Sequence, residues 1–176
     1  FQRKPHWASG TYLDLVLAAV FTQILFFFTA YWIGNYGGEF YEENIREIHY
    51  SLRMQSVLGW MMCILAGVSF SILPLIYDVK GFEKTLMRSY VGMNVFGQIA
   101  ITGGIVSKNL SIFNSLTTAG ITLLCASLVC LWSPAMTIFK SKPGSANKVG
   151  PFSYALGALL PILGLITLLC WVLRNE

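Results

Sequence analysis

Histidine and cysteine are the residues of this 176-residue chain that could hold a haem or a metal ion. Haem iron usually takes an axial histidine, cysteine, methionine or tyrosine, and copper and zinc sites usually combine two or three histidines. His6 and His49 fall on either side of a long apolar run, so we expect no shared metal ion. His49 alone is a candidate axial ligand of a haem.

The four cysteines lie inside apolar runs and none has CxxC spacing. They are Cys63, Cys125, Cys130 and Cys170. A buried cysteine behaves as a small hydrophobic residue, so we interpret these as packing residues, with a ligand or redox role as the alternative. The sequence shows no nucleophile–base pair, glycine-rich phosphate loop or paired carboxylates. We predict no catalytic residue, no metal site and no cofactor.

Two charged residues, Asp14 and Arg88, lie near the ends of apolar runs. Charges inside a membrane-spanning segment are costly and usually have a partner. One interpretation is a structural ion pair between the two runs. The alternatives are that each side chain extends to the membrane surface, or that Asp14 admits protons.

A polar stripe crosses the run that contains Arg88. Asn94, Gln98 and Thr102 are spaced i, i+4 and i+8, which places them on one helix face. Amides of this kind hydrogen-bond between membrane helices, so we interpret the stripe as helix packing. A substrate path is the alternative, although a transporter usually shows a broken helix or a charge at mid-depth.

The segment Glu39–Ser51 has the period of an amphipathic helix. Glu42, Arg46, His49 and Arg53 share one face, while Ile45, Ile48 and Leu52 form an apolar stripe. We predict a short helix at the outer membrane interface. It is either a solvated cap that anchors the bundle or a docking surface for a basic partner or a ligand.

Composition identifies the solvent that these elements face. The chain is 55% hydrophobic and 11% charged, whereas soluble domains carry about 25% charged residues. We predict an all-α, polytopic integral membrane protein that forms one domain over residues 1–176. Its five transmembrane helices, each near the 20 residues that a bilayer needs, cover residues 12–33, 52–77, 86–106, 112–139 and 152–173.

Lysine and arginine are distributed unequally between the predicted loops. Eight of the twelve lie on the side of the N-terminus and four lie on the opposite side. The positive-inside rule then predicts a cytoplasmic N-terminus and an external C-terminus, and the matrix would take the place of the cytoplasm in a mitochondrion. We expect a multi-pass protein of the plasma membrane. The net charge of +4 reflects this topology, and we expect no nucleic-acid partner.

One stretch of the chain, about residues 45–105, contains Gly59-Trp60, Gly67-Val68, Ile72-Leu73-Pro74, Leu86, Arg88 and Gly97. This stretch resembles the catalytic subunit of haem–copper oxidases, particularly the nitric-oxide-reductase branch. Leu52 occupies the place of the family's haem-binding histidine, His49 lies about one turn too early, and the copper-binding histidines have no counterpart. The resemblance implies a shared scaffold without the redox centre.

These observations favour an accessory, non-catalytic subunit of a membrane-bound oxidoreductase complex, such as a respiratory oxidase or an ammonia-monooxygenase-type enzyme. Its partners would be other membrane subunits and lipids. The second hypothesis is a small transporter, channel or lipid-handling protein that uses the polar stripe or Asp14. The third is a haem protein with His49 as ligand.

Overall fold

The computed structural model describes residues 10–67, 70 and 84–140, and every regular element among them is helical. The elements are α1 (Gly10–Tyr36), α2 (Gly38–Glu43), α3 (Ile45–Met54), the π-helix η2 (Gln55–Met61), α5 (Lys84–Val106) and α6 (Leu110–Lys140). The predicted all-α class is therefore confirmed. The predicted span 152–173, most of 68–77, His6 and Cys170 lie outside the described residues.

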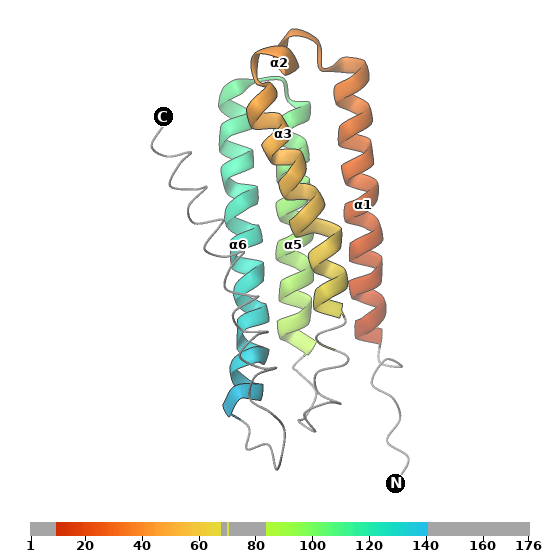
Figure 1. Ribbon diagram of the computed structural model, residues 1–176, viewed down its shortest axis with the longest axis vertical. Coiled ribbons are helices and arrows are strands. Elements are labelled where there is room, and N and C mark those ends of the chain that lie inside the picture. Colours follow the sequence, from red (N-terminus) through yellow and green to blue (C-terminus); the bar gives the residue numbers. More distant parts are fainter. Residues whose placement is uncertain (1–9, 68–69, 71–83, 141–176) are drawn as a thin grey trace.

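The long helices form an antiparallel bundle (Figure 1). Helix α3 continues without a break through η2, and the chain returns to α-helix up to residue 67. Helix α5 is central because it packs against α6, α1 and η2. The first residues of α1 and α5 lie at one end of the bundle, and α2 lies across the other end (Figure 1).

Two of the described helices are long and apolar enough to cross a membrane. These segments are Leu13–Tyr36 in α1, with a mean hydropathy of 2.0, and Leu110–Leu131 in α6, with a mean hydropathy of 1.6. This assignment rests on the length and the amino-acid composition of the two segments. Both segments exceed the roughly 20 residues that span a hydrocarbon core.

Two turns have backbone conformations that end the long helices. Gly38 has a φ of 51°, in the left-handed region that glycine adopts without steric cost, and it follows the end of α1. Lys108, with a φ of 52°, follows α5. Asn109 then caps α6, because its Oδ1 accepts a hydrogen bond from the amide of Ile112 at 3.2 Å. The first turn separates α1 from the helices α2 and α3 that follow it, and the second makes α5 and α6 antiparallel neighbours (Figure 1).

The segment predicted as one interfacial helix, residues 39–51, forms two helices with different directions. Helix α2 lies across the end of the bundle, and α3 runs along it as the first part of the η2 helix (Figure 1). Ile48 and Ser51 are buried, so α3 packs inward along its length. The helix that enters the bundle thus begins at Ile45, seven residues earlier than the predicted start of the second span.

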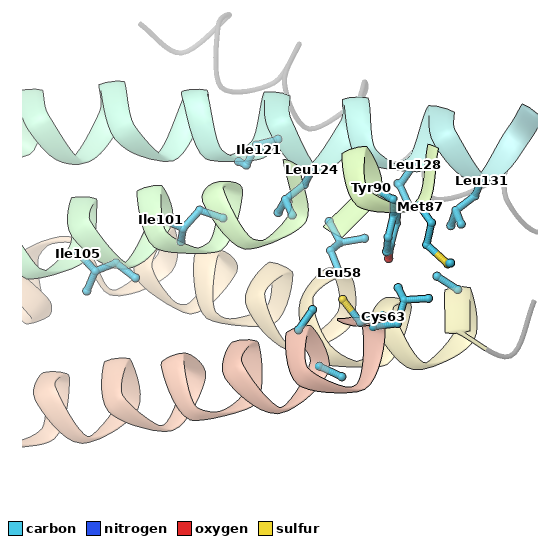
Figure 2. Close-up of a cluster of buried hydrophobic side chains, with 14 of the residues drawn as sticks. Leu58, Cys63, Met87, Tyr90, Ile101, Ile105, Ile121, Leu124, Leu128 and Leu131 are labelled. Carbon is cyan, nitrogen blue, oxygen red and sulfur yellow. The ribbon is translucent and has the colours of Figure 1, made fainter. Parts of the chain in front are cut away.

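Much of the hydrophobic core lies between α5 and α6. Leu124 and Leu128 of α6 point toward α5, where Tyr90 and Ile101 are also buried (Figure 2). The two backbones come close at Gly97 and Gly120, since a Cβ on Gly120 would lie 2.6 Å from the carbonyl oxygen of Gly97. Small residues at a helix crossing permit this approach, which is common in membrane bundles.

The outward face of α1 is apolar from end to end. It carries Leu13, Leu17, Val20, Ile24, Phe27 and Tyr31, each between 51% and 64% exposed. An apolar surface of this extent is unusual on a soluble monomer and marks contact with a membrane or another protein. The helix is thus apolar outward, while its inward face includes the buried Thr22 and Thr29.

Candidate functional site: a buried polar cluster

Five polar side chains meet in the interior where α1, η2 and α5 pack together. This polar cluster consists of Thr29 from α1, Gln55 from η2, and Asn94, Gln98 and Thr102 from α5, and all five are buried. Helical periodicity positions the three α5 residues, because the i, i+4, i+8 spacing keeps them on one face. The predicted stripe therefore faces the bundle interior.

Asn94 fastens α5 to η2. Its Nδ2 donates a hydrogen bond to the backbone carbonyl of Leu58 at 2.6 Å, and its Oδ1 accepts one from the Cys63 thiol at 3.6 Å. Both polar atoms of this amide thus have partners on the neighbouring helix. The Leu58 carbonyl that accepts this hydrogen bond belongs to the π-helical segment η2. Short π-helical segments occur often at functional sites.

A second set of bonds links all three helices. The Nε2 of Gln55 donates to the hydroxyl of Thr102 at 2.6 Å, and this hydroxyl lies 3.1 Å from that of Thr29. The Thr29 hydroxyl itself donates to the carbonyl of Leu25 at 2.7 Å. Since each hydroxyl has one proton, Thr102 must donate to Thr29. The result is a directed chain, whose bonds polarise and strengthen one another.

Gln98 is the exception within the cluster. Its side chain is fully buried, yet neither Oε1 nor Nε2 has a hydrogen-bond partner, and the Oε1 of Gln55 also lacks one. Gly59 of η2 makes room for it, because a Cβ at Gly59 would lie 3.1 Å from the Gln98 Nε2. A buried amide without a partner costs about 1–3 kcal/mol, so this position is a functional candidate.

The chemistry of the polar cluster is that of hydrogen bonding. Amides and hydroxyls bind other helices or a small polar solute, and none of the five side chains titrates near neutral pH. Within residues 10–67, 70 and 84–140, no group of three or more His, Cys, Asp and Glu side chains is arranged to hold a metal ion.

Asp14 and Arg88 lie in one groove between α1 and α5, outside the polar cluster. The groove has a volume of about 480 Å³ and is otherwise lined by apolar side chains and Gly92. No ion pair within 4.0 Å joins the two residues. Asp14 is half-buried and Arg88 is exposed. The structure thus brings the predicted partners to the same groove without pairing them.

The predicted docking residues lie at the other end of the bundle. Glu42 of α2 and Arg46, His49 and Arg53 of α3 are all exposed. The Nε2 of His49 lies 2.8 Å from the hydroxyl of Tyr41, within hydrogen-bonding distance. A haem bound through this nitrogen would have to displace the Tyr41 hydroxyl.

Gln55 and Thr29 contribute to the site, although sequence reasoning did not single them out. Each is a polar residue inside an apolar run, and this is the signal that could have identified them. The π-helical form of η2 has no comparable signal in the sequence. The segment carries both Gln55 and the Leu58 carbonyl, which bond to side chains of the same α5 face.

Comparison with known proteins finds no family model that matches the chain, no similar curated protein and no similar solved structure.

Proposed function

We propose that the chain is a five-span membrane protein with a cytoplasmic N-terminus and that it acts as a non-catalytic subunit of a membrane-bound oxidoreductase complex. In this proposal the polar cluster holds the bundle together, while the outer faces contact lipid chains and neighbouring subunits. The complex is of the respiratory oxidase or membrane monooxygenase type.

The distribution of polarity carries this proposal. Helices α1 and α5 direct amides and hydroxyls inward, where most of them bond to another helix, and they expose large apolar side chains outward. A soluble bundle has the opposite arrangement. The continuous apolar face of α1, from Leu13 to Tyr31, offers a neighbouring membrane helix a contact along its whole length.

The oxidoreductase part of the proposal rests on the resemblance of residues 45–105 to the haem–copper catalytic scaffold. Toward the end of the bundle where α2 lies, Glu42, Arg46 and Arg53 form an exposed charged face. This face supplies the polar contacts that a subunit interface requires outside the membrane. Both features suit a chain that packs against a catalytic subunit.

Purification of the full chain from native membranes in mild detergent tests the proposal. We expect the chain to migrate in an assembly with other membrane proteins that carry redox centres. The double change Ile24→Ala and Phe27→Ala on the outward face of α1 should release it, while Phe96→Ala, an equally exposed aromatic residue on α5, serves as control. A chain that migrates alone as a monomer contradicts the proposal.

The second candidate function is a small transporter or channel, and Gln98 is the observation that favours it. A polar side chain that is buried without a partner, next to a π-helical segment, is suited to bind a passing solute. Transport would use the interface between η2 and α5.

Gln98→Leu separates the two functions, because it removes no hydrogen bond of the side chain. If the polar cluster serves packing, the variant assembles as the parent does. Loss of solute flux in proteoliposomes, with assembly unchanged, would favour transport instead. Asn94→Leu is the less selective variant, since it breaks the bond to the Leu58 carbonyl.

A further inference from the structure

The groove between α1 and α5 is built from matching ridges of the two helices. Its α1 wall consists of residues 14, 17, 18 and 21, and its α5 wall consists of residues 88, 91, 92 and 95. Both sets have the spacing i, i+3, i+4 and i+7. Because the two helices begin at the same end of the bundle, the walls run side by side for about 10 Å, the rise of seven helical residues (Figure 1).

The two charges occupy equivalent places on these ridges. Asp14 and Arg88 are the first residues of their walls, so both lie at the end of the groove nearest the helix starts. The walls then continue with Leu17, Phe21, Val91 and Val95, which are all apolar. The groove thus has a polar end with one charge of each sign and an apolar remainder.

This division matches one class of ligand, an amphipathic lipid. A guanidinium binds phosphate oxygens with charge-assisted, often bidentate, hydrogen bonds. A carboxylate accepts hydrogen bonds from a primary ammonium, whereas a quaternary ammonium has no N–H to donate. Since Asp14 and Arg88 are not paired with each other, each can bind one charge of a zwitterionic head group.

We propose that the α1–α5 groove binds a phosphoethanolamine lipid, with its phosphate on Arg88, its ammonium on Asp14 and one chain between Leu17, Phe21, Val91 and Val95. The space beside Gly92 is open, because a Cβ built there has no atom within 4 Å. The proposal rests on the membrane location in the proposed function, and it adds a selective lipid site.

Native mass spectrometry of the full chain in detergent tests this site with three dioleoyl lipids whose head groups are phosphoethanolamine, phosphocholine and phosphoglycerol. We expect one phosphoethanolamine lipid to bind about tenfold more tightly than the phosphocholine lipid. Asp14→Asn should abolish this preference. Arg88→Gln should lower the binding of all three lipids.

Matched variants distinguish lipid binding in the groove from general effects of charge and folding. Lys84→Gln removes an exposed positive charge at the same end of α5 but outside the groove, so its lipid binding should equal that of the parent. Gly92→Leu should block binding without disturbing the bundle. Gly34→Leu, at a position of α1 that is equally open and lies outside the groove, should not affect binding.

Equal binding of the phosphoethanolamine and phosphocholine lipids, or equal effects of Arg88→Gln and Lys84→Gln, would overturn the proposal. Alkaline carbonate extraction of membranes distinguishes this failure from failure of the proposed function. A chain that is released by carbonate contradicts the membrane location. A chain that is retained but shows no lipid preference contradicts the groove proposal alone.

Discussion

At the scale of single residues, the buried amides of α5 differ in what they contribute. Asn94 satisfies its side chain with the Leu58 carbonyl and the Cys63 thiol, whereas Gln98, one turn further along, leaves both amide atoms without a partner. Hydrogen bonds between membrane helices contribute about 0.6–2 kcal/mol each. The two residues are similar in chemistry, so their difference in bonding predicts a difference in stability.

We expect Asn94→Leu to lower the free energy of unfolding by about 1–2 kcal/mol, because it removes the interhelical bond and leaves the Leu58 carbonyl without this donor. Gln98→Leu should be neutral or stabilising, since it replaces a buried amide that has no partner. Thermal unfolding of the two variants in the same detergent measures the difference. Equal stabilities would show that the Asn94 bond contributes nothing.

At the scale of the elements, α5 has two faces that contact other helices. The face with Asn94, Gln98 and Thr102 meets α1 and η2 through hydrogen bonds, and the face with Gly97 and Gly104 meets α6 through close backbone approach. Polar contacts on one side and small residues on the other explain why this helix is central.

We expect Gly120→Ala to destabilise the hairpin of α5 and α6 by about 1–3 kcal/mol, the usual cost of overpacking a core. The new Cβ would lie 2.6 Å from the carbonyl oxygen of Gly97 and 2.7 Å from Cγ1 of Ile101, so the two helices would have to separate. Gly92→Ala, where the Cβ meets nothing within 4 Å, is the matched control.

Thermal unfolding of both variants in one detergent gives the comparison. A Gly120→Ala variant as stable as Gly92→Ala would mean that α5 and α6 do not cross closely at Gly97.

At the scale of the whole molecule, the bundle has an apolar exterior along α1, an interior that combines the hydrophobic core with the polar cluster, and charged groups near its ends. Asp14 and Arg88 lie near one end, and the charges of α2 and α3 lie toward the other. Near the end that holds α2, the Lys108 ammonium lies 5.1 Å from the centre of the Trp32 ring. This is a cation–π contact between the α5–α6 turn and α1. This arrangement predicts that α5 crosses the membrane.

Cysteine labelling tests this topology with two substitutions that bracket α5. A membrane-impermeant maleimide added to intact cells should label Lys108→Cys in the full chain and should not label Lys84→Cys. We expect this result because Lys84 lies on the predicted cytoplasmic side and Lys108 on the outer side. The unsubstituted chain measures the background of the native cysteines. Labelling of both variants, or of Lys84→Cys alone, would contradict the orientation.

The helical class, the ends of several helices and the inward direction of the α5 stripe were predictable from the sequence alone. Hydropathy and periodicity are properties of neighbouring residues, so they reveal that residues 86–106 form a helix and that Asn94 and Gln98 share a face. The short connection between the predicted helices 86–106 and 112–139 was likewise predictable, and the structure places it at residues 107–109 between α5 and α6. Each of these features follows from residues that lie close together in the sequence.

Only the tertiary structure decided which groups the stripe meets. The rotation and register of α1 and η2 against α5 bring Gln55 to Thr102 and Asn94 to the Leu58 carbonyl, and they leave Gln98 without a partner. They also place Asp14 and Arg88 at one end of the same groove. Such contacts join residues more than thirty positions apart. Side-chain packing between helices selects among them, and local periodicity carries no information about that packing.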